Sequence, residues 1–191
     1  HTIGRRQRQM CIRDSPSASA ESALLCLDQG DLDGATQHID AASIRGEGAI
    51  VSYVRGNIAA NQGHLKAAKS YFDEAIDTDP THVRARLNRA SIHMASGNAQ
   101  DALDDANVLL ELAPGLALAK LRRAEANMML TNWEAAKDDL EVIIEDAPHH
   151  HHALTQLAAC YISMDRPEKA EAPLNEACLL YTSDAADDLW C

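Results

Sequence analysis

The sequence has few aromatic residues and no long apolar run. Aromatic side chains make up 4% of the 191 residues, although hydrophobic residues as a whole reach 46%. Small and aliphatic side chains therefore supply most of the apolar content, which favours closely packed helices over a sheet sandwich. No run of about 18 apolar residues occurs, so we expect no membrane-spanning helix.

Positive charge is scarce as well. Lys and Arg number 17 against 29 Asp and Glu, and the formal net charge is −12. This balance argues against a general nucleic-acid binder, because phosphate backbones attract positive surface. The five Cys show neither a CxxC motif nor the spacing of metal ligands. We therefore expect no nucleic-acid partner, no metal site and no cofactor.

The motifs of common enzyme sites are missing. The sequence contains no GxSxG, no HExxH, no P-loop and no glycine-rich nucleotide loop. Carboxylates are abundant, but they recur along repeating helical surfaces and are not gathered in one segment. We therefore predict that residues 16–177 are not an enzyme and hold no catalytic residues.

The two ends of the chain are related to each other through their codons. One set of codons for CLLYTSDAADD (178–188), read on the opposite strand in a shifted frame, encodes RRQRQMCIRD (5–14). We interpret residues 1–15, expected to be disordered, and residues 178–191 as translated sequencing-library adapter. The alternative is that the arginines near the N-terminus form a basic arm for nucleic acid. Because no polar capping helix is visible before residue 178, we expect a fragment of a longer array.

The middle of the chain repeats with a period of 34 residues, and four independent series show it. The series are Ala68, Ala102, Ala136 and Ala170; Gly56, Ala90, Ala124 and Ala158; Pro80, Pro114 and Pro148; and Arg55, Arg89 and Arg123. Each unit has two apolar helical stretches, a turn between them and a proline at the end. The small residues predict the points where the two helices of a unit approach most closely, since a larger side chain there would push the pair apart.

This pattern resembles the tetratricopeptide repeat. The small residue of the family's first helix, the alanine and large residue of its second helix and its closing proline fall on Gly56, Ala68, Phe72 and Pro80. The resemblance implies an all-α fold, an α-solenoid of stacked antiparallel helix pairs wound into a right-handed superhelix. The expected units are a degenerate repeat at 16–48, repeats at 49–82, 83–116 and 117–150, and a truncated repeat at 151–177.

The repeating arginines allow two interpretations. First helices are basic and second helices are acidic, so the resemblance implies a concave groove that is less negative than the rest of the surface. Arg55, Arg89 and Arg123 also recur in step with Asp105 and Asp139. We therefore favour ion pairs between neighbouring helices over ligand binding for these three residues.

The groove positions of the family predict the binding residues. They are Tyr53, Asn57, Asn61, Arg84, Leu87, Asn88, Ser91, Leu118, Arg122 and Glu125. The resemblance implies a scaffold that binds a peptide or helix of a partner protein. The alternative is a non-catalytic arm of a larger kinase, peptidase or glycosyltransferase, or part of a repeat lipoprotein for exopolysaccharide export or protein sorting. The style of the repeats is similar to bacterial arrays, with cytoplasm and periplasm both open.

Two narrower possibilities come from single residues. Asn57, Asn88 and Arg122 match three places of the clamp with which one subfamily grips a terminal carboxylate, but Tyr53 and Leu118 stand where that clamp has lysines. The run from His149 to His152 suggests a metal site, yet four consecutive residues cannot face one ion from a helix. We expect a solvated turn in which His151 and His152 begin a helix.

Overall fold

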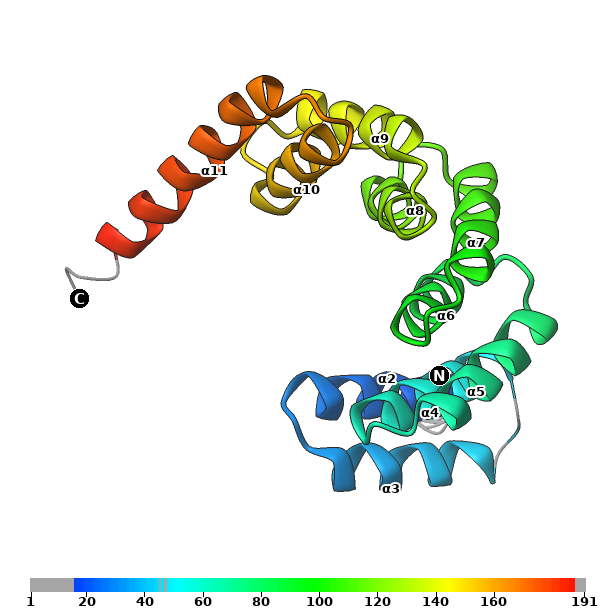
Figure 1. Ribbon diagram of the computed structural model, residues 1–191. Coiled ribbons are helices and arrows are strands. Elements are labelled where there is room, and N and C mark those ends of the chain that lie inside the picture. Colours follow the sequence, from blue (N-terminus) through cyan, green and yellow to red (C-terminus); the bar gives the residue numbers. More distant parts are fainter. Residues whose placement is uncertain (1–15, 45, 47, 188–191) are drawn as a thin grey trace, which may run out of the picture. The chain divides into compact units, whose positions relative to one another are not determined.

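The computed structural model describes residues 16–44, 46 and 48–187 (Figure 1). Within these residues the chain forms ten helices and no strand, which confirms the all-α prediction. In chain order they are α2 (Pro16–Asp28), α3 (Leu32–Ser43), α4 (Ala49–Asn61), α5 (Leu65–Thr78), α6 (Val83–Ala95), α7 (Ala99–Leu112), α8 (Ala117–Met129), α9 (Trp133–Asp146), α10 (His151–Ser163) and α11 (Pro167–Asp187). The predicted adapter segment 1–15 lies outside the described residues, and α11 continues as helix across the predicted boundary at Ala177.

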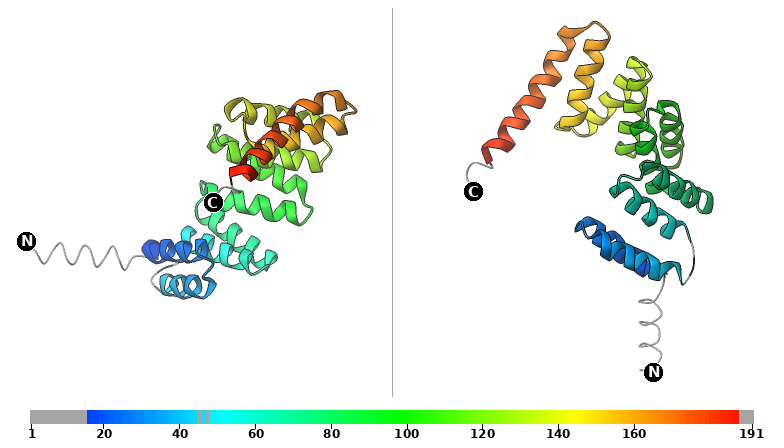
Figure 2. Two further views of the ribbon diagram at one scale, coloured as in Figure 1. Left: turned by 90° about the vertical axis from the view of Figure 1, so that its left-hand side faces the viewer. Right: turned by 60° about the horizontal axis from the view of Figure 1, so that its bottom comes forward.

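The chain divides into two compact units, residues 1–92 and 93–191, with the boundary inside α6. In the first unit α2 packs against α3 and α4 packs against α5, and α4 also contacts α2 and α3 (Figures 1 and 2). In the second unit α8 packs against α9 and α10 against α11, while α7 contacts α8 and α9 contacts α10. Short connections make the paired helices antiparallel. The chain is therefore an α-solenoid of helix pairs.

The small residues of the repeat lie at the buried helix contacts, as the period predicts. Ala68, Ala102 and Ala136 are fully buried, and Ala170 is nearly so. The first-helix series of Gly56, Ala90, Ala124 and Ala158 is buried in the same way. At Gly56 the fit is tightest, because an added β-carbon would overlap the fully buried ring of Phe72.

The turn between the two helices of each repeat needs one residue in the left-handed backbone conformation. Gly30, Gly63 and Gly97 adopt φ values of 76°, 77° and 77° at this point. Thr131 and Asp165 occupy the same point of the last two units with φ values of 62° and 59°. A left-handed conformation is strained for any residue with a β-carbon and more so for a β-branched one. The turns of the last two repeats, at Thr131 and Asp165, therefore carry backbone strain, whereas the turns of the first three repeats have glycine.

The closing prolines end the second helices. α5, α7 and α9 stop at Thr78, Leu112 and Asp146, two residues before Pro80, Pro114 and Pro148. The residue directly before each proline is outside the helical region, with ψ values between 82° and 95° at Asp79, Ala113 and Ala147. A following proline ring disfavours the helical conformation at that residue, so the helix cannot continue.

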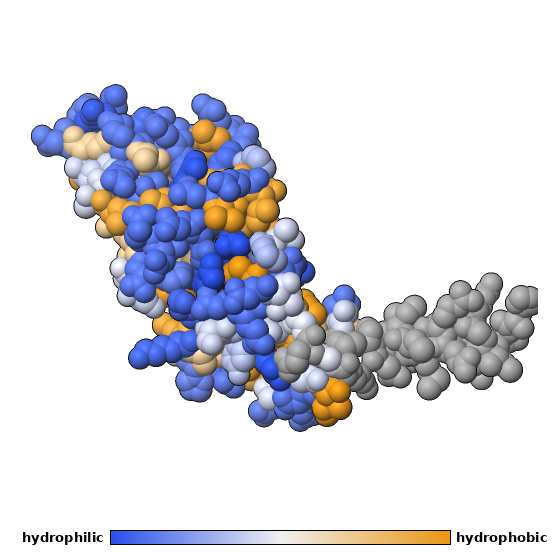
Figure 3. Space-filling view, turned by 90° about the vertical axis from the view of Figure 1, so that its right-hand side faces the viewer, coloured by the Kyte–Doolittle hydropathy of each residue, from blue (hydrophilic) through white to orange (hydrophobic). Residues whose placement is uncertain are grey.

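Many acidic residues of the second helices are on the surface, whereas Asp105 and Asp139 are buried. Glu74, Asp104, Glu111, Asp138 and Glu145 are all exposed. The face of the molecule in Figure 3 is mostly hydrophilic, with hydrophobic side chains in separate patches. Among the helices that the structure describes, none combines the length and the hydrophobicity that crossing a membrane requires.

Replacing Thr131 by glycine is expected to stabilise the protein. Glycine adopts a positive φ without steric strain, so Thr131→Gly should raise the free energy of unfolding by about 1 kcal/mol in urea denaturation. Thr155 lies inside α10 and gives a matched control, since Thr155→Gly should lower stability. A Thr131→Gly protein no more stable than the wild type would show that the turn is not strained.

Replacing Gly56 by alanine is expected to destabilise the protein, against helix propensity. Propensity alone would favour alanine by about 1 kcal/mol. Overlap with the Phe72 ring should outweigh this gain, at an overpacking cost of about 1–3 kcal/mol. A double-mutant cycle with Phe72→Leu should show that the effect of Gly56→Ala shrinks when the ring is removed. Equal effects in both backgrounds would contradict this origin.

Candidate functional site

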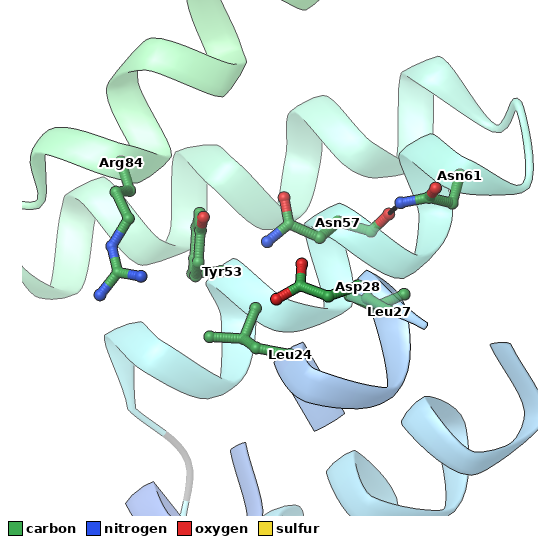
Figure 4. A pocket seen from close by; sticks show the side chains of 7 residues that line it. All are labelled: Leu24, Leu27, Asp28, Tyr53, Asn57, Asn61 and Arg84. Atoms are coloured by element: carbon green, nitrogen blue, oxygen red, sulfur yellow. Dashed lines mark hydrogen bonds between the residues drawn. The ribbon is translucent and has the colours of Figure 1, made fainter. Parts of the chain in front are cut away.

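A pocket of about 370 Å³ opens between three helices of the first unit (Figure 4). Its lining residues are Leu24, Leu27 and Asp28 from α2; Tyr53, Asn57 and Asn61 from α4; and Arg84 from α6. The volume falls in the range of small-ligand sites, enough for a few side chains of a peptide. The structure thus brings four of the predicted groove residues to one place.

The ring of Tyr53 is held in place by aromatic neighbours. Tyr53 is 7% exposed, and its ring centroid lies 6.1 Å from that of Phe72 and 4.9 Å from that of His82. Tilted ring pairs at such distances attract each other. The guanidinium of Arg84 lies 5.7 Å from the Tyr53 centroid, so the ring also positions a cation at the pocket.

Asn57 is held by its neighbours from two sides. Its Oδ1 accepts a hydrogen bond of 2.6 Å from Nδ2 of Asn88, and its backbone carbonyl accepts one of 2.9 Å from Nδ2 of Asn61. Within the described part of the chain, Nδ2 of Asn57 and Oδ1 of Asn61 have no hydrogen-bond partner. The pocket therefore offers one fixed amide donor and one amide acceptor.

The predicted groove residues of the second unit form a separate polar cluster. Glu125 is 16% exposed and accepts from Nη1 of Arg122 at 2.6 Å. Nε2 of His152 lies 3.0 Å from Glu125 Oε1, and Nε2 of Gln156 lies 3.5 Å from the same oxygen. Leu118 is 42% exposed. The carboxylate of Glu125 thus joins α8 to α10.

Two of the predicted groove residues, Leu87 and Ser91, offer little surface or hydrogen-bonding capacity to a ligand. Leu87 is buried, and the hydroxyl of Ser91 donates to the carbonyl of Leu87 in its own helix at 3.1 Å. The three residues that match a carboxylate clamp already have partners within the protein. Asn57 and Asn88 form a hydrogen bond with each other, and Arg122 is paired with Glu125.

Sequence reasoning missed the contribution of α2 and α10. Leu24, Leu27 and Asp28 stand 33 residues before Asn57, Ala60 and Asn61, the same offset that separates Ala35 from Ala68. Extending the predicted groove positions Asn57 and Asn61 into the degenerate repeat by this offset would have found Leu24 and Asp28. In the same way, His152 and Gln156 follow Leu118 and Arg122 by the period of 34.

Arg89 and Arg123 form ion pairs between helices, as predicted, and Arg55 forms a hydrogen bond to a hydroxyl. Arg123 donates to both carboxylate oxygens of Asp139, at 2.7 and 2.6 Å, and these bonds raise the pKa of Arg123 above its usual range. Arg89 pairs with Asp73 at 2.8 Å, and Arg55 donates to the hydroxyl of Ser43 at 2.7 Å. Hydrogen bonds in which both groups are charged are stronger than neutral ones, so these pairs tie neighbouring helices together.

The four consecutive histidines have separate surroundings. Nδ1 of His149 lies 3.5 Å from Glu176, and Nδ1 of His150 accepts from the backbone N–H of Ala153 at 3.1 Å. α10 begins at His151, which confirms the predicted helix start, and His152 contacts Glu125. Among the residues that the structure describes, no group of His, Cys, Asp and Glu is placed to hold a metal ion.

His82 links the start of α6 to the pocket. Its Nδ1 accepts from the backbone N–H of Ala85 at 3.1 Å, which requires the neutral imidazole, and its ring packs on Tyr53. Burial lowers the pKa of His82 below its usual value of 6.5, and the nearby Arg84 acts in the same direction, while Asp79 opposes them. Neutral His82 therefore stabilises both the helix start and the pocket.

Family models match the middle of the chain. A tetratricopeptide repeat model matches residues 53–117, and a second tetratricopeptide repeat model matches residues 118–150. Together they span 53–150, or 98 of the 191 residues (150 − 53 + 1). No curated protein sequence matches the chain at a significant level.

Several solved structures are similar in fold. MamA (residues 41 to the end) from Desulfovibrio magneticus RS-1 matches with a TM-score of 0.79 and 18% identity, over 89% of this chain and 97% of its own. YrrB, described as a TPR protein with an unusual peptide-binding site, matches with a TM-score of 0.73 and 18% identity, over 88% and 87%. The first TPR of Spaghetti (RPAP3), bound to the HSP90 peptide SRMEEVD, matches with a TM-score of 0.59 and 27% identity, over 61% and 93%.

The stability of the protein is expected to depend on the protonation of His82. Because the folded-state pKa of His82 is below 6.5, its contribution is complete above pH 6.5 and is lost as the pH falls through the lower folded-state value. His82→Asn keeps a capping side chain but does not titrate. The wild type should therefore lose more stability than His82→Asn between pH 7 and pH 5 in urea denaturation. Parallel losses would contradict this assignment.

Proposed function

Because the chain belongs to the tetratricopeptide repeat family, we propose that it is a protein-interaction module whose first-unit pocket binds a peptide segment of a partner. The proposal includes no catalytic step. The observation that carries it is the pocket itself, in which Tyr53, Asn57, Asn61 and Arg84, all expected at the groove, lie together around one hollow.

The pocket is suited to an extended peptide. Nδ2 of Asn57 can donate to a backbone carbonyl, and Oδ1 of Asn61 can accept from a backbone N–H. Asn57 is already oriented by Asn88, so little conformational entropy is lost when a ligand binds. Leu24 and Leu27 offer apolar surface for a side chain between these polar contacts.

Two of the similar structures support peptide binding as the role. One holds an HSP90 peptide on its repeats, and the other is described by its peptide-binding site. The polar cluster around Glu125 gives the second unit its own groove-type residues, which we propose as a separate binding surface.

The proposal can be tested by selecting peptides on the immobilised chain from a random phage-displayed library. Binding of labelled synthetic copies is then measured by fluorescence anisotropy. Asn57→Ala should weaken binding about 10-fold, because it removes the fixed donor and leaves the peptide carbonyl without its hydrogen-bond partner. Circular dichroism melts would show whether each variant stays folded.

Asn107 gives the matched control, because it is an exposed asparagine on α7, a second helix. Asn107→Ala should leave binding unchanged. Selected peptides that bind Asn57→Ala as tightly as the wild type would place the binding surface elsewhere and contradict the proposal.

A further inference from the structure

Two opposite charges line the first-unit pocket, and they come from different helices. Asp28 ends α2, and Arg84 lies in the first turn of α6. Both side chains are exposed, and neither forms an ion pair or a hydrogen bond with any other residue that the structure describes. They are the two charged residues of the lining, so each is available to a ligand group of the opposite sign.

The two charges are held apart by the centre of the pocket. In Figure 4 the ring of Tyr53 lies between Arg84 and Asp28, and the side chain of Leu24 lies beside it. The Arg84 guanidinium is positioned by the face of that ring at 5.7 Å. A ligand that pairs with both charges must therefore cross an apolar centre formed by Tyr53 and Leu24.

Two amides add uncharged polar groups to the pocket. The free Nδ2 of Asn57 is a donor, as Arg84 is, and suits a negative or carbonyl group. Oδ1 of Asn61 is an acceptor, as Asp28 is, and suits a positive or N–H group. In Figure 4 both amides lie on the Asp28 side of the Tyr53 ring, so they add a donor and an acceptor beside Asp28 and leave Arg84 alone on the other side.

The charge of the whole chain favours a ligand that is not purely acidic. With a formal net charge of −12, the protein repels anionic peptides at long range and attracts cationic ones. A segment with positive charge alone would leave Arg84 facing a like charge. A segment with both charges satisfies both ends of the pocket.

We propose that the first-unit pocket selects a mixed-charge peptide segment, in which an aliphatic side chain separates one basic from one acidic side chain. The aliphatic side chain packs on Leu24 and the Tyr53 ring. The basic group pairs with Asp28, and the acidic group pairs with Arg84. This inference rests on the proposed peptide binding and specifies the chemistry of the peptide.

The test uses the peptides enriched on the wild-type chain, as fluorescein-labelled synthetic copies. Asp28→Asn and Arg84→Gln should each weaken binding about 5-fold, the upper range for an exposed ion pair. Arg84→Lys keeps the charge and should retain most of the affinity. Asp33→Asn and Lys66→Gln change exposed charges away from the pocket and should leave binding unchanged.

A charge exchange separates a direct pair from a general electrostatic effect. A peptide in which the basic residue is replaced by glutamate should bind the wild type weakly. Asp28→Lys should restore the binding of this peptide and weaken the binding of the parent peptide. A general field effect would shift both peptides without this reversal.

The outcomes distinguish the two proposals. Enriched peptides that carry both charges and show the reversal support the mixed-charge inference. Peptides that need Asn57 but carry one sign of charge, or ignore Asp28→Asn and Arg84→Gln, overturn the inference and leave peptide binding in place. Peptides that ignore Asn57→Ala as well overturn both.

Discussion

The close approach of the two helices within each unit is the constraint on which the rest of the structure depends. Small residues at the contact let the backbones meet, and buried alanines repeat this condition along the chain. At Gly56 the absence of a β-carbon makes room for the Phe72 ring, and Phe72 in turn packs on Tyr53. The position of Tyr53, which lines the candidate pocket, therefore depends on the contact between α4 and α5 at Gly56 and Phe72.

Polar contacts also join the first helices of successive repeats. Asn88 donates to Asn57 in the first unit, and Gln156 and His152 contact Glu125 in the second. Each contact joins a residue in the first half of one first helix to a residue further along the preceding one. These contacts position the side chains of Asn57 and Glu125, and a positioned side chain would lose less entropy in the proposed binding. The same residues thus join neighbouring helices and belong to the proposed binding surfaces.

The charged residues fall into two groups, arginines paired within the protein and acidic residues exposed on the second helices. Arginines of the repeating series are used inside the protein, where Arg89 and Arg123 pair with Asp73 and Asp139. Exposed acids of the second helices keep the outer surface hydrophilic. Asp28 and Arg84 belong to neither group, which is why we propose them as binding residues.

The sequence by itself determined the helix pairs, their turns and the buried small positions, because each depends on local spacing and on a period that recurs in every unit. It also predicted that Tyr53, Asn57, Asn61 and Arg84 belong to one surface. Only the tertiary structure decided that α2 supplies Leu24, Leu27 and Asp28, that Asn57 and Asn88 bond to each other, and that Arg89 pairs with Asp73. Those contacts depend on side-chain distances between helices, and a repeat period does not specify such distances.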